Sequence, residues 1–193
     1  MEQIDEPERP KAILYEHAVG SLADLRQELE QILSTSFEFS IGRETGGAGT
    51  PYPALEVILI FATSATTAII TSVLNELGKD VYKALKGKLF KKPFEKDSTM
   101  DFSVTIVSSE VVTKGTIRTD NFDDVIEVMK NVKELFDNSS KINVSEVKQV
   151  SNMRIWGRDK QIIDRGNFFF HYEYDASEAK WVLKKIAKIE KGI

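Results

Sequence analysis

The sequence predicts an α+β protein in which a sheet packs on a long central apolar helix and two amphipathic helices, with a β-rich C-terminal extension. Three observations indicate this class. Segments rich in Val, Ile and Thr alternate with segments of helical periodicity. A long uncharged run lies between them, and aromatic residues gather toward the C-terminus. The chain of 193 residues is 41% hydrophobic and 29% charged, which is typical of a globular domain with a buried core.

Composition and charge exclude several classes of protein. The chain has no Cys, so a disulfide scaffold and a Cys-ligated zinc module are excluded. The net charge is −4, and a general nucleic-acid binder would more often be basic. Residues 1–10, MEQIDEPERP, form an acidic tail without the basic start and apolar stretch of a secretory signal. We therefore expect a cytoplasmic protein, with membrane association as the alternative.

The first elements follow from local patterns. Residues 11–16, KAILYE, predict a short strand. Gly20 and Ser21 then open a helix in which Leu residues recur at spacings of three and four. Residues 37–41 alternate between apolar and polar side chains, which predicts a strand. The loop at 42–53 is rich in Gly and Pro, but it lacks the Gly-Lys-Ser/Thr of a phosphate-binding loop.

Residues 54–77 predict one long apolar helix, because no charge occurs from Val57 to Asn75. That uncharged run would measure about 28 Å as a helix, close to the bilayer core of about 30 Å. A buried core helix and a membrane span are both consistent with this run. We favour the buried helix, because a span would separate the strands on its two sides.

A basic helix is predicted at 79–92, with Gly78 as the break before it. Its apolar side is small, and lysines cover the rest. A solvated helix face is the simplest interpretation. An acidic protein partner or an anionic membrane surface is the functional alternative. The candidate contacts are Lys83, Lys86, Lys88, Lys91 and Lys92.

Two strands and a helix complete a predicted α+β domain over residues 11–140. Residues 101–119 are rich in Val, Ile and Thr and predict two strands with a turn near 108–110. Asp120 or Asn121 caps the next helix, whose apolar stripe runs from Phe122 to Phe136. Residues 137–145 are a polar connector.

An aromatic, β-rich C-terminal unit is predicted at 146–193. Strands are expected at 147–156 and at 167–174, where Phe168, Phe170, Tyr172 and Tyr174 share one face. The stretch after Asp175 is ambiguous. It forms either a helix with a capping box or a strand that pairs with 167–174, and helix propensity favours the helix.

Few residues carry candidate chemistry. His171 lies on the face of its strand opposite the aromatic set and beside Glu173. With Trp156 and Tyr172 these residues form a candidate ligand pocket, whereas packing of the C-terminal unit is the simpler interpretation of the aromatics. His17 and His171 are too far apart to suggest a metal site. We predict no catalytic residue, metal or cofactor.

The order of elements resembles the effector-associated constant-component proteins of bacterial conflict systems. The matching pieces are SLADLRQELEQIL, FEFSIGRETGGAG, ALEVILIFATSATTAIITSVLNEL with KGKLFKK, and DFSVTIVSSE through VKELF, covering about residues 12–136. This resemblance implies a non-catalytic adaptor that works beside effectors in defence, and it transfers no catalytic residue.

The sequence therefore leads us to expect a non-enzymatic adaptor acting through protein contacts. Two alternatives remain open. One is a membrane-associated component using residues 54–92, and the other is a small-ligand-binding module or enzyme using the aromatic C-terminal unit. The sequence leaves the partner, the ligand and the oligomeric state undetermined.

Overall fold

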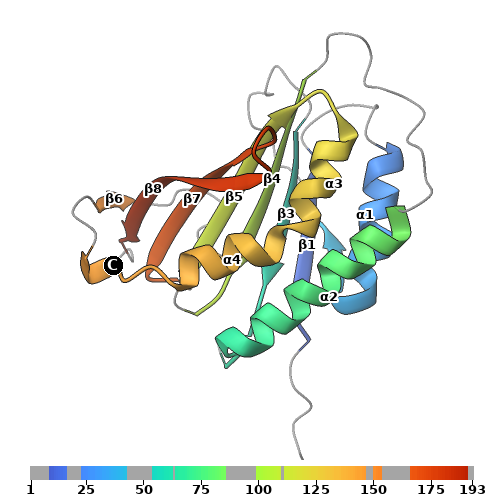
Figure 1. Cartoon of the computed structure of the whole chain (residues 1–193). Coiled ribbons are helices and arrows are strands. Elements are labelled where there is room, and N and C mark those ends of the chain that lie inside the picture. Colours follow the sequence, from blue (N-terminus) through green and yellow to red (C-terminus); the bar gives the residue numbers. More distant parts are fainter. Residues whose placement is uncertain are drawn as a thin grey trace, which may run out of the picture.

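The structure is a computed structural model that describes residues 9–16, 23–42, 54–62, 64–85, 99–109, 111–146, 150–153 and 166–190. These residues form one eight-stranded sheet with four α-helices on a single face (Figure 1), which confirms the α+β class. The elements are β1 (Lys11–Glu16), α1 (Ala23–Ser36), β2 (Glu38–Ile41), β3 (Ala54–Ile60), α2 (Thr67–Leu85), β4 (Met100–Val107), β5 (Val111–Thr119), α3 (Phe122–Lys130), α4 (Val132–Ser140), a short 3₁₀ turn (Val144–Glu146), β6 (Ser151–Met153), β7 (Phe168–Asp175) and β8 (Lys180–Ile189).

The strands lie in the order β2-β1-β3-β4-β5-β7-β8-β6. The parallel pairs β1–β2 and β3–β4 are connected through α1 and α2, because parallel neighbours need a crossover. The pairs β4–β5 and β7–β8 are antiparallel neighbours in sequence. Strand β7 pairs with β5 in parallel, so the aromatic C-terminal strands continue the same sheet.

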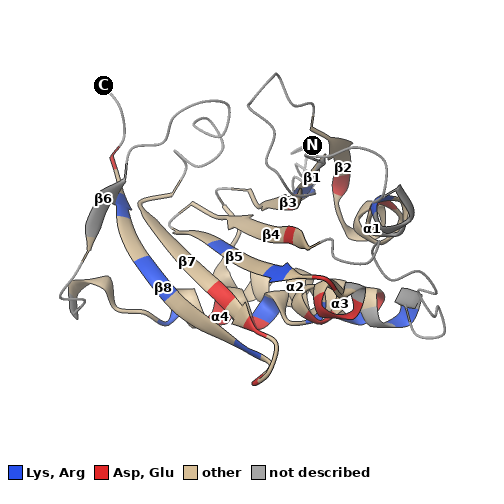
Figure 2. Ribbon diagram, turned by 90° about the horizontal axis from the view of Figure 1, so that it is seen from above, with Lys and Arg blue, Asp and Glu red and all other residues tan. Residues whose placement is uncertain are grey.

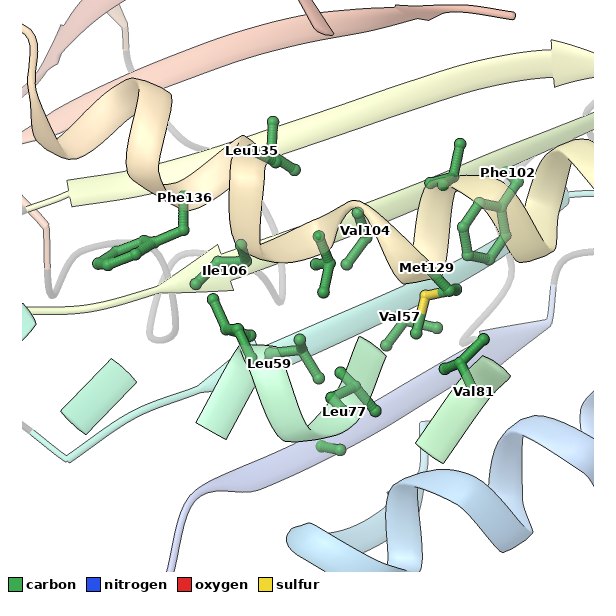
Figure 3. Close-up of a cluster of buried hydrophobic side chains, with 14 of the residues drawn as sticks. Val57, Leu59, Leu77, Val81, Phe102, Val104, Ile106, Met129, Leu135 and Phe136 are labelled. Carbon is green, nitrogen blue, oxygen red and sulfur yellow. The ribbon is translucent and has the colours of Figure 1, made fainter. Parts of the chain in front are cut away.

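The main core lies between the sheet and its helices. Side chains from β3 and β4 meet those from α2, α3 and α4 (Figure 3). Fully buried members of this core are Val57, Leu59, Leu77, Val81, Phe102, Val104, Ile106, Met129 and Leu135. Burial of this apolar area is the main stabilising contribution to the two-layer arrangement.

The predicted helix over 54–77 is wrong, because its first part is the strand β3. From Val57 to Ile60 every residue is buried, so both faces of this strand are covered. A strand buried on both faces has a continuous apolar sequence that its periodicity cannot distinguish from a buried helix. Helix α2 begins only at Thr67. Within the described ranges, none of the helices combines the length and the apolar character needed to cross a bilayer.

Gly78 does not break the chain into two helices, since α2 runs through it to Leu85. A Cβ atom at Gly78 would lie 2.9 Å from the carbonyl oxygen of Lys130, so the glycine allows α2 and α3 to approach closely. The predicted basic helix at 79–92 is therefore the last part of α2 as far as Leu85, and residues 86–92 lie outside the described residues.

Several local predictions are confirmed. The strands at 11–16 and 37–41 are β1 and, from Glu38, β2. Ser108 closes the turn between β4 and β5, and its backbone N–H donates to the carbonyl of Val111 over 3.0 Å. Asn121 caps α3 by accepting from the backbone N–H of Asp123.

The single predicted helix divides at Asn131, and α4 continues to Ser140 rather than ending before the polar connector.

The C-terminal stretch is a strand, so the preference for a helix after Asp175 is wrong. The turn between β7 and β8 includes Ala179, whose φ of 48° lies in the left-handed region. Trp181 and Ile186 of β8 then pack into the main core. The strand predicted at 147–156 is observed only as β6, and residues 147–149 and 154–156 lie outside the described residues.

Candidate functional site

The face of the sheet opposite the helices carries polar side chains over β3, β4, β5 and β7. Successive side chains of a strand point to opposite faces, so Glu56 points away from the helices while Leu55 and Val57 belong to the core. The register places Glu56 beside Ser103, which lies beside Thr116 on the next strand. These residues form one polar row across the sheet.

A depression of about 800 Å³ lies over these strands. We call its surface the open face and define it by the polar residues that line it, which are Glu56, Asp101, Ser103, Lys114, Thr116, Arg118, His171 and Glu173. Toward the other end of the same strands this side of the sheet is apolar and buried, with Ile60, Val107 and Val112 at most 8% exposed. The polar character is therefore confined to one half of the sheet.

Glu56 and Lys114 form the most enclosed ion pair of the open face. The Lys114 ammonium donates to Glu56 Oε1 over 2.7 Å, and the Thr105 hydroxyl donates to the same oxygen over 3.2 Å. The side chains of Glu56 and Lys114 are only 16% and 31% exposed. These two bonds compensate for removing the carboxylate from water.

His171 and Thr116 form the second polar contact, with Nε2 of the imidazole 3.0 Å from the threonine hydroxyl oxygen. That hydroxyl oxygen also lies 3.3 Å from the carbonyl oxygen of Tyr172. Because a hydroxyl has one hydrogen, two arrangements fit this geometry: either Nε2–H of His171 donates to Thr116 while the hydroxyl donates to the carbonyl, or the hydroxyl donates to an unprotonated Nε2. In the first arrangement Nδ1 of the neutral ring is an acceptor, and in the second it is a donor.

The pKa of His171 is held below its ordinary value of 6.5, chiefly because burial disfavours the imidazolium. The negative charge of Glu173 opposes this shift, and the positive charges of Lys114, Lys185 and Lys184 add to it. His171 is therefore a neutral hydrogen-bonding group at pH 7.

Two more exposed ion pairs flank these contacts. Arg118 donates to both carboxylate oxygens of Asp101, over 2.6 and 3.0 Å. Glu173 pairs with Lys184 of β8 at 3.0 Å. Figure 2 shows the basic segments of β5 and β8 on either side of the acidic segment of β7. The carboxylates of the open face are thus matched by cations from neighbouring strands.

The four residues of the predicted ligand pocket fall in different places. His171 and Glu173 lie together on the open face. Tyr172 points to the helix side, where it is 3% exposed. Burial raises its pKa to about 12, and its hydroxyl has no hydrogen-bond partner among the described residues. Trp156 lies outside the described residues.

Of the five lysines predicted as partner contacts, Lys83 is described and the other four, Lys86, Lys88, Lys91 and Lys92, lie outside the described residues. Lys83 is exposed near the end of α2 and lies 3.6 Å from Asp80. It lines a groove of about 500 Å³ between α2 and the α3–α4 junction. The other residues lining this groove are Asn75, Gly78, Lys79, Lys130, Asn131 and Lys133.

Sequence reasoning missed most of the open face, although two local signals were present. Glu56 is the single charge in the apolar strand ALEVILI. Lys114, Thr116 and Arg118 alternate with the buried residues of β5, as expected for polar side chains on one face of a strand. Neither signal shows that these residues face one another, because that depends on the order of the strands.

Within the described residues, no group of three or more His, Cys, Asp or Glu side chains is arranged to hold a metal ion. No protein-family model matches the chain, and no significant match is found among the curated proteins or the solved structures.

Proposed function

We propose that the protein is a non-catalytic binding protein that takes a small polar ligand on the open face of its sheet. The observation that carries this proposal is the depression of about 800 Å³ lined by charged and hydroxyl side chains from four strands. Its volume falls within the range of about 300 to 1,000 Å³ found for ligand pockets. Rigid strands hold these groups in fixed positions, which favours specific recognition.

The hydrogen bonding of Thr116 favours binding over catalysis. A nucleophilic hydroxyl gives its proton to an adjacent base. Here the carbonyl oxygen of Tyr172, 3.3 Å away, competes with His171 for the single hydrogen of the Thr116 hydroxyl. The other titratable groups are held in ion pairs, so they provide recognition groups for a ligand rather than an activated nucleophile.

An amide-resolved NMR titration with a set of polar fragments tests this proposal. The set contains amino acids, sugars, nucleosides, nucleotides and di- and tricarboxylates. Shift changes are expected at β3, β4, β5 and β7, and Thr116→Val should weaken them. Thr67→Val, at the exposed first position of α2, is the matched control. Changes confined to the helices, or none with any fragment, would contradict the proposal.

A second candidate function is favoured by the groove between α2 and the α3–α4 junction. Among the described residues that line this groove, four are lysines and none is acidic. Each lysine pairs with a carboxylate of its own helix region, namely Glu76, Asp80, Glu127 or Asp137. The pairs of Lys79 and Lys83 are the more exposed ones, and those of Lys130 and Lys133 are half-buried. Exposed pairs contribute only about 0 to 1 kcal/mol, so a partner's carboxylates can replace those of Lys79 and Lys83. The lysines of this groove favour an adaptor that binds an acidic protein segment. The resemblance to the defence-system proteins also implies an adaptor.

Binding of a labelled amphipathic peptide of Glu and Leu, followed by fluorescence anisotropy, tests the adaptor function. The double changes Lys79→Glu with Lys83→Glu, and Lys130→Glu with Lys133→Glu, should each abolish binding. Lys180→Glu, on β8, is the matched control. Flotation with anionic liposomes examines the membrane alternative. Equal peptide binding by all variants would show that the peptide does not bind at the groove.

A further inference from the structure

Strand β8 carries a β-bulge where it passes His171. His171 pairs with Lys185, whereas the next residue of β7, Tyr172, pairs with Leu183, so Lys184 is the extra residue. In a regular strand Lys184 and Lys185 would point to opposite faces. Here Lys184 pairs with Glu173 and Lys185 lies opposite His171. The bulge therefore presents two consecutive lysines on the side of the open face, as bulges next to functional sites do.

In this region the carboxylates have ion-pair partners, but not every lysine does. Glu56 is bound by Lys114, and Glu173 is bound by Lys184. Lys185 is exposed and has no acidic partner among the described residues. His171 lies in register between Lys114 on β5 and Lys185 on β8. The charge left unbalanced at this end of the open face is positive.

The depression is also much larger than an inorganic ion. A volume of about 800 Å³ accommodates an organic molecule. Lys184 and Lys185 lie beside the depression rather than in its lining, next to the lining residues Glu173 and His171. The hydroxyls of Ser103 and Thr116 and the carboxylate of Glu56 also line it. These groups fit hydroxyl or amino groups of a ligand, because oxygen acceptors bind such donors.

We propose that the open face binds an organic anion, with its phosphate or carboxylate group at His171, Lys184 and Lys185 and its hydroxyl or amino groups toward Ser103, Thr116 and Glu56. This inference rests on the proposed ligand-binding function and specifies its ligand class. The ammonium groups of the bulge supply charge-assisted hydrogen bonds to the anion.

Probes that differ only in their anionic group measure how much that group contributes to binding. AMP is compared with adenosine, and glucose 6-phosphate with glucose, while inorganic phosphate and citrate separate a phosphate from a carboxylate preference. Each is titrated into the full-length protein at pH 7, and amide NMR shifts are followed. At least one anion should perturb β5, β7 and β8 and bind about tenfold more tightly than its neutral counterpart. In free energy, tenfold is about 1.4 kcal/mol.

Three variants of β8 test the place of binding. Lys184→Gln with Lys185→Gln should weaken binding of the best anion about tenfold or more. Deletion of Lys184 should restore regular pairing and also weaken binding, since it removes one ammonium group. Lys188→Gln is the matched control, because Lys188 is exposed but pairs with Phe168, whose side chain packs on the helix side. It should leave the affinity unchanged.

The outcomes separate this inference from the function on which it rests. Equal binding of anionic and neutral probes at the open face would overturn the anion assignment and leave the ligand-binding function in place. The same holds if the double variant binds the anion as tightly as the parent chain. Absence of any shift on the open face, with these probes and with the fragment set, would overturn both.

Discussion

Lys114 of β5 reaches across β4 to place its ammonium 2.7 Å from the carboxylate of Glu56 on β3. The pair lies where three strands meet, and Thr105 of the intervening strand donates to the same carboxylate oxygen. The contact therefore ties together three neighbouring strands on the side of the sheet opposite the four described helices.

Removing the lysine alone should destabilise the protein. Lys114→Met leaves the Glu56 carboxylate, 16% exposed, with only the Thr105 hydroxyl, and we expect a loss of about 1 to 3 kcal/mol in the free energy of unfolding. The double change of Lys114→Met with Glu56→Leu should recover much of this loss, because no unpaired charge remains. Urea unfolding measures both. A double variant no more stable than the single one would contradict this account.

Two tyrosines of β7 provide a matched comparison of buried hydroxyl groups. Within the part of the chain that the structure describes, the buried hydroxyl of Tyr172 has no hydrogen-bond partner, whereas the Tyr174 hydroxyl accepts from the Asn131 side chain over 3.1 Å. Tyr172→Phe should therefore leave stability unchanged or raise it by up to about 1 kcal/mol, since it removes an unsatisfied polar atom. Tyr174→Phe should lower it by about 0.5 to 1.5 kcal/mol. Thermal and urea unfolding distinguish these results, and the reverse order would refute the assignment.

The elements of the fold could be predicted from the sequence where the local pattern of residues agrees with the local structure. Asn121 caps α3, and the aromatic residues Phe168, Phe170, Tyr172 and Tyr174 alternate along β7 as expected. Strands β3 and β8 differ from the predicted helices, because long-range contacts determine their structure. Strand β3 is buried on both faces and so lacks the alternation that would identify it. Strand β8 contains good helix formers, but pairing with β7 and burial of Trp181 override that propensity.

The same distinction explains how much of the candidate site was predictable. His171 and Glu173 are two residues apart on one strand, so alternation alone places them on one face. Glu56 and Lys114 become partners only because β4 separates β3 from β5 in the sheet. The bulge at Lys184 depends on the register between β7 and β8. Neither strand order nor register is contained in the pattern of a single segment.

Gly78 should not tolerate a larger side chain, although it lies inside a helix. Alanine has a helix propensity more favourable than glycine by about 1 kcal/mol. At this position, however, the added Cβ would lie 2.9 Å from the backbone carbonyl oxygen of Lys130. We expect Gly78→Ala to destabilise the protein by about 1 to 3 kcal/mol, because α2 and α3 must separate. Ser72→Ala, at an exposed position of α2, should be neutral or slightly stabilising. Urea unfolding that shows a gain for Gly78→Ala would contradict close helix packing here.

The protonation of His171 should couple to stability. Its environment combines burial with the positive charges of Lys114 on β5 and of Lys184 and Lys185 on β8, and only Glu173 favours the imidazolium. The pKa is therefore lower in the folded chain than in the unfolded chain, where it is close to the ordinary 6.5.

Above pH 6.5 the histidine is neutral in both states, and its contribution to stability is fully present. As the pH falls below 6.5, the unfolded chain binds the proton first, so stability is lost until the pH reaches the folded pKa. Urea unfolding between pH 8 and pH 5 should show a steeper loss for the parent protein than for His171→Gln, and the variant controls for the carboxylates that titrate at lower pH. An NMR titration of the His171 ring should give a midpoint below 6.5. A midpoint above 6.5 would show that Glu173 outweighs burial and the three lysines, and parallel stability profiles for the two proteins would show that it balances them.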